Sequence, residues 1–411
     1  MPQRTARRSA ITTPEPGLNP FKEALNQDLN EHIDPFSGTL QHKYVDMYIP
    51  GNGGLDLKVS RVYTSPQEAL GVRTVTGAGW TMHFGRVVIP TDYTDTLCLQ
   101  DLYAVSTKDN PSIEFPDGGR ELLVLDAVHG TYLITKSGWR AMCNGSGQGL
   151  ILTSPTGTVY TMDALNTLNN HWSWYTTNIR DRHGNTIDVT YKTNPSNFIY
   201  IDTVTASDGR QVKFEYLDEE SATIRLHKIT ANEQTWTYRY EPVEAIGPGY
   251  GDNYHNLTEV IRPDGLRSRY SYYPYTSLET AGNYALETVT YPYGANITYT
   301  YQHIDFTPTD LSIDRTTAIA TKEVSGNPPG ISVGPGSSLP GGVWRFEFEP
   351  HSPELFFTDK GTWTSGLDKT TVRMPGGKQV FYHYGYSYTG GLSSGLLWLT
   401  GMLYKLSLIH I

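Results

Sequence analysis

The feature that most constrains the fold of this chain is a spacing between glycine and tyrosine that recurs, although most of the residues between them differ from copy to copy. In five segments a glycine is followed seven residues later by a tyrosine, and an aliphatic residue stands five places before the glycine. A sixth copy, NEQTWTYRY, ends at Tyr240, lacks the glycine and is one residue shorter. The glycine–tyrosine pairs of the other five are Gly184 and Tyr191, Gly209 and Tyr216, Gly265 and Tyr272, Gly294 and Tyr301, and Gly377 and Tyr384.

Large and polar residues alternate between each glycine and its tyrosine. The large sets include Val212, Phe214 and Tyr216 and, in the last copy, Val380, Tyr382 and Tyr384. Period-two alternation after a D-G, H-G or Y-G turn indicates a β-hairpin with one buried face. A single hairpin cannot bury that face alone, so consecutive copies must stack on one another. We therefore predict that residues 170–303 form consecutive antiparallel hairpins in one continuous twisted sheet.

The glycine has a mechanical role in this prediction. A tight hairpin turn needs a positive φ, which glycine takes without strain, so positive φ is expected at Gly209 and Gly265. The tyrosine ring supplies a large buried area, while its hydroxyl reaches water or a backbone partner at the edge of the sheet. The other residues of each copy can vary, because this geometry requires only the spacing between glycine and tyrosine and the alternation of buried and exposed side chains.

The part of the chain before the regular copies is less ordered in pattern. Residues 1–32 are expected to be a disordered or short-helix tail, and the helix that the sequence favours falls at residues 19–33. Residues 33–165 are predicted to be β-rich, with looser hairpins at residues 112–125 and 152–162.

The regular hairpins are expected at residues 166–303. Residues 304–342 are predicted to be an irregular insertion that ends in a Gly/Pro/Ser-rich loop, and the hairpins resume at residues 343–405. Residues 406–411, LSLIHI, resemble the translation of a transposon-end adapter and are expected to be an artefact. The alternative is a genuine apolar strand end.

The repeated units resemble the YD repeats of the RHS repeat family, in which a turn glycine precedes a tyrosine-rich strand that ends in a Y-D-like pair. The pair survives loosely here as Tyr216, Leu217 and Asp218. Residues 33–65 and 77–85 are also similar to the segment that opens many RHS repeat regions, so the resemblance covers roughly residues 33–384. The positions that fit the opening pattern are Asp34, Pro35, Gly38, Pro50, Gly51, Gly53, Gly54, Leu55, Arg61, Tyr63, Ser65, Gly77, Gly79 and Trp80.

The resemblance implies an all-β fold, a YD-repeat hairpin array that forms a spiralling, shell-like sheet around a hollow interior. This chain would be a partial, open fragment of such a shell. In bacterial members the shell encloses a C-terminal toxic domain, and relatives include toxin-complex components, polymorphic toxins and the animal teneurins. The family's aspartate-dependent self-cleaving core segment has no counterpart before Lys405, so neither that protease nor a toxin activity is carried over to any residue here.

The partners that the resemblance implies are the remainder of the same polypeptide, namely further repeats and a C-terminal toxin. The implied location is secreted or at the cell surface, although residues 1–20 show no signal peptide because no apolar core follows their basic residues. The isolated fragment is expected to be non-toxic and to self-associate through an open edge strand, with the part after residue 343 least protected from exchange.

Composition excludes several other classes of protein. The net charge of −10 argues against nucleic acid or an acidic membrane as a partner. No run of 18 apolar residues is present in the sequence, so no membrane span is expected. The two cysteines, Cys98 and Cys143, either form one disulfide or are two unrelated buried thiols.

The sequence offers no convincing catalytic, cofactor or metal site. The segment GNGGLDL at residues 51–57 lacks the Lys-Ser/Thr of a phosphate loop and is predicted to be a turn between strands. The histidines show no metal-ligand spacing, the acids at residues 218–220 are typical of a solvated turn, and Ser146 lies outside a G-x-S-x-G frame.

We therefore expect a non-enzymatic structural shell fragment that uses no cofactor. The first alternative is a carbohydrate- or cell-surface-binding adhesin module, in which exposed tyrosines stack on glycans. The second is a glycan-degrading enzyme, which would need two carboxylates about 5–10 Å apart in a cleft.

Overall fold

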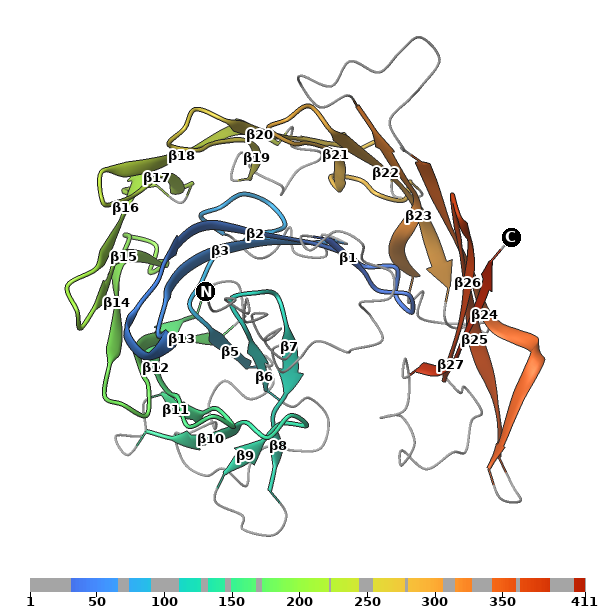
Figure 1. Ribbon diagram of the computed structural model, residues 1–411, viewed down its shortest axis with the longest axis horizontal. Helices are drawn as coiled ribbons and strands as arrows, with labels where there is room; N and C mark the ends of the chain where they lie inside the picture. Colours follow the sequence, from blue (N-terminus) through green and yellow to red (C-terminus); the bar gives the residue numbers. More distant parts are fainter. Residues whose placement is uncertain are drawn as a thin grey trace, which may run out of the picture.

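The computed structural model describes residues 31–65, 74–89, 111–126, 132–144, 149–167, 172–221, 223–243, 254–277, 280–305, 315–326, 342–359, 363–384 and 403–410. These residues form two antiparallel β-sheets with no α-helix in the described ranges. A large curved sheet wraps around a small one that lies inside its curve (Figure 1). The all-β prediction is confirmed.

The small sheet, here called the inner sheet, comes from the start of the described chain. Its four strands pair in chain order, and a short 3-10 turn at Asn52–Gly54 joins the second to the third. The strands are β1 (Glu31–Ile33), β2 (Leu40–Ile49), β3 (Leu57–Thr64) and β4 (Trp80–Thr81).

The large sheet begins as a small closed roll. Its first strand pairs with the first half of β13, whose second half continues into the hairpins. Apolar side chains such as Val87, Leu133 and Trp174 fill the interior of the roll. The strands are β5 (Arg86–Ile89), β6 (Ser112–Glu114), β7 (Arg120–Leu122), β8 (Val124–Leu125), β9 (Leu133–Ile134), β10 (Arg140–Cys143), β11 (Leu150–Thr153), β12 (Val159–Asn166) and β13 (Trp172–Arg180).

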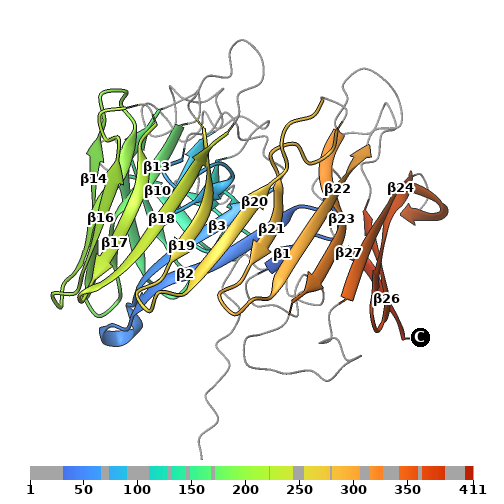
Figure 2. The same cartoon turned by 90° about the horizontal axis from the view of Figure 1, so that it is seen from above.

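From β13 onward each strand pairs antiparallel with the next, and these strands stand side by side as the part called here the wall (Figure 2). The wall stays open, since β27 pairs only with β26 among the described strands. The wall strands after β13 are β14 (Thr186–Thr193), β15 (Ile199–Ala206), β16 (Gln211–Leu217), β17 (Arg225–Ala231), β18 (Gln234–Pro242), β19 (His255–Ile261), β20 (Arg267–Tyr272), β21 (Leu286–Thr290), β22 (Asn296–Asp305), β23 (Arg315–Ser325), β24 (Gly342–Asp359), β25 (Trp363–Met374), β26 (Gly377–Tyr384) and β27 (Leu403–His410). The prediction of consecutive hairpins over residues 170–303 is confirmed.

The regular hairpins share one turn. At Gly209 the amide donates to the carbonyl of Ala206 at 2.9 Å, and the amide of Ala206 donates to the carbonyl of Arg210 at 2.8 Å. The three-residue loop thus ends on a residue with positive φ, which is +90° at Gly209 and +81° at Gly265, as predicted. Gly184 and Gly294 take the same conformation, as do Gly118, Gly138 and Gly157 in the roll.

Replacing Gly265 by valine is expected to lower the free energy of unfolding by about 1–3 kcal/mol through backbone strain. No atom lies within 4 Å of the place that a Cβ would take there, so steric crowding does not contribute. Gly376 is the matched control, because its surroundings are equally open and its φ lies outside the left-handed range. Urea unfolding would refute the turn assignment if Gly265→Val and Gly376→Val unfolded at the same concentration.

Two copies use shorter turns. In the copy that ends at Tyr240, Asn232 and Glu233 form a two-residue loop with φ of +48° and +63°, which is the primed turn that hairpins favour. At Gly377 the loop is also two residues, because Met374 pairs directly with Gly377.

Because the turn at Gly377 is shorter, the face of β26 that was predicted to be buried is wrong. Losing one loop residue shifts the register by one, and a one-residue shift exchanges the two faces of a strand. Phe381 and His383 are therefore buried on β26, and Phe381 belongs to the main hydrophobic cluster. Val380 is also buried but lies outside that cluster, and Tyr382 is half-buried. The expected set of Val380, Tyr382 and Tyr384 does not form the core face, and the side chain of Tyr384 lies outside the described residues.

The repeat tyrosines hold the hairpins where their strands separate. Each regular hairpin keeps three residue pairs next to its turn and then opens. There the hydroxyl of Tyr216 donates to the carbonyl of Ile201 at 2.6 Å, which satisfies a backbone acceptor that the ladder no longer reaches. The equivalent bonds join Tyr191 to Thr176 at 2.8 Å, Tyr272 to Leu257 at 2.8 Å and Tyr301 to Leu286 at 2.7 Å.

The same tyrosines mark the bends of the wall. Tyr191, Tyr216, Tyr240, Tyr272 and Tyr301 each stand at an irregularity in the ladder with the following strand. A β-bulge bends its strand and increases the local twist. Its recurrence on every second strand accounts for the continuous curve of the wall in Figure 1.

Several predicted boundaries change. Glu31 and His32, assigned to the tail and to the end of a short helix, are the first residues of strand β1. The stretch at residues 304–342, expected to be irregular, contains strand β23, which pairs with β22 over ten positions. Residues 403–410 form β27, a pairing compatible with either origin of residues 406–411. Residues 1–30, which make up nearly all of the predicted tail, and the middle of the Gly/Pro/Ser-rich loop lie outside the described residues.

Candidate functional site: the contact between the inner sheet and the wall

The concave face of the wall is packed against the inner sheet, and one hydrophobic cluster includes side chains of both sheets. The resemblance implies a hollow interior; in the described part of the chain, the opening segment lies inside the curve and contacts the wall. The buried residues from the inner side are Ile33, Leu40, Tyr44, Met47, Leu57, Val59, Tyr63, Trp80 and Phe84. The wall contributes residues that include Val189, Phe214, Leu226, Tyr238, Val260, Tyr270, Val289, Tyr299 and Phe346.

A buried ion pair lies at the centre of this contact. The Nε of Arg61 on β3 donates to both carboxylate oxygens of Asp46 on β2, at 2.7 and 3.0 Å. Only 2% and 6% of the two side chains are exposed. A bulge in the β2–β3 ladder falls at Asp46, the kind of irregularity that re-aims a side chain.

Two wall tyrosines add hydrogen bonds to this ion pair. The hydroxyl of Tyr238 donates to Asp46 at 2.8 Å, and Nη2 of Arg61 donates to the hydroxyl of Tyr270 at 2.8 Å. The guanidinium also lies over the rings of Tyr44 and Trp80, 4.3 and 4.8 Å from their centroids. Such stacking and hydrogen bonding compensate for removing the charge from water.

The electrostatics follow from this geometry. Burial opposes the charged form of Arg61, but Asp46 and the surrounding tyrosines outweigh it and raise the pKa of Arg61 above its ordinary value. Burial, followed by the negative charge of Asp46, raises the pKa of Tyr238 well above its ordinary value. Arg61 is therefore a permanent cation and Tyr238 a neutral donor near neutral pH.

A second polar cluster joins β1 and β2 to the wall. Tyr299 on β22 donates a hydrogen bond to Glu31, and the Nε2 of His42 lies 2.6 Å from the Tyr299 hydroxyl. Lys322 on β23 donates to the other oxygen of Glu31 at 2.5 Å, with its ammonium 5.0 Å from the ring centroid of Trp344. Burial and the charge of Glu31 raise the pKa of Tyr299 well above its ordinary value.

Backbone hydrogen bonds also cross between the sheets. Where the wall hairpins open, amides of the wall donate to acceptors of the chain between residues 38 and 85. These bonds run from Thr176 to the Gly85 carbonyl at 3.1 Å, from Leu226 to the Val75 carbonyl at 2.8 Å, from Leu286 to the Tyr63 hydroxyl at 2.8 Å and from Ile319 to the Gly38 carbonyl at 3.0 Å. The wall amides freed by hairpin opening are thus satisfied by residues 38–85, here called the inner segment.

The close approach explains several glycines of the opening pattern. At Gly51 a Cβ would lie 2.2 Å from an Nη atom of Arg210, whose guanidinium donates to the carbonyls of Ile49 and Leu55. At Gly38, whose φ is +67°, a Cβ would lie 2.3 Å from the Cβ of Ala318. These glycines let the inner segment touch the wall.

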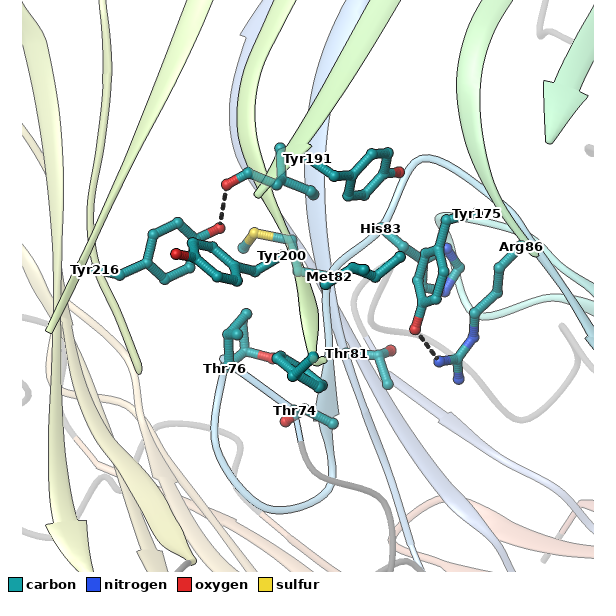
Figure 3. A pocket seen from close by; sticks show the side chains of 14 residues that line it. Thr74, Thr76, Thr81, Met82, His83, Arg86, Tyr175, Tyr191, Tyr200 and Tyr216 are labelled. Carbon is teal, nitrogen blue, oxygen red and sulfur yellow. Dashed lines mark hydrogen bonds between the residues drawn. The ribbon is translucent and has the colours of Figure 1, made fainter. Parts of the chain in front are cut away.

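A small pocket lies where the chain at residues 74–86 meets β13–β16 (Figure 3). Its volume of about 40 Å³ holds a few water molecules, whereas ligand sites usually measure about 300–1,000 Å³. His83 lines it, and burial together with the charge of Arg86 lowers the pKa of His83 to about 3. A neutral imidazole agrees with its Nδ1 accepting the Gly85 amide at 3.1 Å.

Sequence reasoning found part of this contact. Arg61, Tyr63 and Trp80 were picked out by the opening pattern, and the structure brings all three to the wall. Asp46 was missed. The alternation placed Tyr238 and Tyr299 on the same face as the repeat tyrosines, but it gave no contact between them and the inner sheet. The signal was present, since the position two places before the repeat tyrosine is tyrosine in four copies and apolar in the first two.

The other segments considered as sites in the sequence do not lie together in the structure. The 51–57 segment is the turn between β2 and β3, and the acids at residues 218–220 lie in the turn between β16 and β17. Ser146 lies outside the described residues. Within the described ranges no three His, Cys, Asp or Glu side chains are grouped to hold a metal, and no helix has the length and apolar character needed to cross a membrane. Cys143 is in a disulfide, and Cys98 lies outside the described part.

Comparison with known proteins gives similarity at the level of solved structures. No family model and no curated protein matches the sequence. The N-terminal domain of the effector protein SpvB from Salmonella typhimurium strain LT2 is 13% identical, with a TM-score of 0.27 over 69% of this chain and 99% of that one. The Photorhabdus luminescens Tc holotoxin pore is 12% identical, with a TM-score of 0.34 over 91% of this chain and 23% of that one. The TcdB2-TccC3-Cdc42 structure is 11% identical, with a TM-score of 0.27 over 90% and 19%.

Proposed function

We propose that this chain is a non-enzymatic structural segment of a longer, secreted or surface RHS-repeat protein. Its wall would be part of a shell that encloses and delivers a C-terminal toxin. The toxin and the secreted location rest on the resemblance of the opening segment and of the repeats.

The observation that supports the structural role is the set of hydrogen bonds that the repeat tyrosines make. The hydroxyls of Tyr191, Tyr216, Tyr272 and Tyr301 donate to wall carbonyls, and that of Tyr240 donates to the Val75 carbonyl of the inner segment at 3.3 Å. The residues that recur in the sequence therefore hold backbone in place. All five hydroxyls donate to backbone carbonyls.

Three carboxylates near the interior have structural partners as well. Asp46 pairs with Arg61, Glu31 with Lys322 and Glu114 with Arg86. A glycosidase needs one carboxyl group that can give up a proton and a second that can attack or activate water. Carboxylates neutralised by buried cations are poorly suited to the first of these tasks.

The test uses a chain extended by the coding sequence that follows residue 405. We expect further glycine–tyrosine units and then a distinct C-terminal segment that resists protease in the extended protein and is digested when expressed alone. Equal digestion of that segment in both settings would contradict enclosure. Coding sequence that ends in more repeats and a surface anchor would favour the adhesin.

The adhesin alternative has its own control. Tyr48 and Tyr293 are the aromatic residues most exposed in the described part of the chain, at 57% and 55%. Glycan binding that disappears on Tyr48→Ala or Tyr293→Ala, and survives Tyr216→Phe, would replace the structural proposal with a binding function.

A further inference from the structure

We infer that the wall carries an intramolecular binding site that recognises polar residues of β2 and β3 and fixes where along the wall the inner sheet docks. The site consists of Tyr238, Tyr270 and Tyr299, each two places before a repeat tyrosine. The inference goes beyond the proposed function, because it concerns how two sheets of one chain recognise each other. It stands or falls independently of any enclosed toxin.

The three tyrosines meet successive positions of the inner sheet. Tyr238 donates to Asp46 at 2.8 Å, and the ring of Tyr270 lies 6.0 Å from that of Tyr44. Tyr299 lies 2.6 Å from His42. Residues 42, 44 and 46 thus pair, in reverse order, with tyrosines on β22, β20 and β18. From one wall hairpin to the next, the residue of β2 that is contacted changes by two positions.

The two earlier copies provide the contrast. At the equivalent position they carry Val189 and Phe214, which are buried in the same hydrophobic cluster. Apolar packing is not directional, so it permits the inner sheet to lie at several positions along the wall. Four copies carry a tyrosine at this position, and in three of them a polar group of the inner segment faces its hydroxyl. The fourth, Tyr382, lies on the other face of β26 because of the register shift at Gly377.

A shift of the inner sheet would be costly for this reason. Moving β2 by two residues keeps the same face toward the wall. A shift toward β16 would nevertheless carry Asp46 and Arg61 away from Tyr238 and Tyr270, toward the stretch that presents Phe214 and Val189. A shift the other way would carry His42 away from Tyr299. The Asp46–Arg61 pair lies within the inner sheet and would be kept, but it would lose the hydroxyls of Tyr238 and Tyr270. A buried polar group that loses a hydrogen-bonding partner is disfavoured, and register selection is the best-attested use of buried polar groups.

Three wall amides report docking directly. The amides of Leu226, Leu286 and Ile319 donate to Val75, to the Tyr63 hydroxyl and to Gly38, all in the inner segment. Their hydrogen exchange depends on the inner sheet being in place. Amides in the β14–β15 ladder bond within the wall, so they report the wall alone.

The test is hydrogen exchange at residue resolution on the full chain carrying Tyr238→Phe, Tyr270→Phe and Tyr299→Phe together. These changes keep the rings and remove the hydroxyls. We expect exchange at the amides of Leu226, Leu286 and Ile319 to rise about tenfold or more, with the β14–β15 amides changing less than about twofold. Tyr273→Phe is the control, because its hydroxyl donates to the Tyr299 carbonyl within the wall, and it should leave the three amides unchanged.

Unchanged exchange at the three amides in the triple variant would overturn the inference. An equal rise at the β14–β15 amides would overturn it too, because the hydroxyls would then support the whole fold and not docking. If the triple variant does not fold, Asp46→Leu with Arg61→Met decides, since it removes the charges that the tyrosines bind. That variant should fold and show the same selective rise, and protection equal to the parent would contradict the inference.

Discussion

Asp46→Ala is expected to lower the free energy of unfolding by about 3–5 kcal/mol, because it leaves the Arg61 guanidinium buried without its carboxylate. The matched control is Glu347→Ala, which breaks the pair with Arg373. Those two side chains are 45% and 52% exposed, and an exposed pair contributes less than about 1 kcal/mol. Urea unfolding followed by tryptophan fluorescence measures both variants.

A second comparison separates the charge from its pairing. The double variant Asp46→Leu with Arg61→Met removes both charges and fills a similar volume, so it should recover much of the lost stability. Equal midpoints for Asp46→Ala and Glu347→Ala would show that the Asp46–Arg61 pair does not lie in a buried contact between the sheets.

Alkaline pH above 10 is expected to unfold the protein cooperatively. Burial is the main cause that raises the pKa of seven tyrosines well above the ordinary value of 10.0; they are Tyr44, Tyr191, Tyr216, Tyr238, Tyr272, Tyr299 and Tyr301. The folded state keeps these protons where the unfolded state loses them. Stability is therefore fully present below pH 10 and falls as pH rises above it, by about 1.4 kcal/mol per unit for each tyrosine.

Because seven groups act in the same direction, stability should fall steeply above pH 10. The ultraviolet absorbance of tyrosinate and the loss of circular dichroism should therefore rise together. Tyr293→Phe, at an exposed position, should leave the midpoint unchanged. Titration of the buried tyrosines near pH 10 with the fold intact would contradict their placement.

The hairpin array was predictable because its physics is local. A turn glycine fixes a loop, the loop fixes the register, and the register decides which side chains are buried, as at Gly209, Val212 and Phe214. The same logic explains the error at Gly377. Its sequence spacing is the same as in the other copies, but the loop has one residue fewer and the faces of β26 exchange.

The contact between the sheets was less predictable because it joins residues far apart in the chain. Asp46 and Tyr238 are separated by 192 positions, and no local pattern links them. The opening pattern did mark Arg61 and Trp80, yet it could not show that they lie inside the curve of the wall. The strand pairing of β23 was missed because the Gly/Pro/Ser composition that follows it dominated that stretch.

The central claim is that the opening segment lies inside the curve of the wall, and zero-length carbodiimide cross-linking with peptide mapping tests it most directly. Lys43 lies 3.1 Å from Asp117, and Lys322 lies 2.5 Å from Glu31, so each pair joins the inner sheet to the large one. Lys369 and Glu349, 2.8 Å apart on adjacent wall strands, are the internal control. We predict Lys43–Asp117 and Lys322–Glu31 linked peptides within single chains. Formation of the Lys369–Glu349 link without either of the other two would contradict the account.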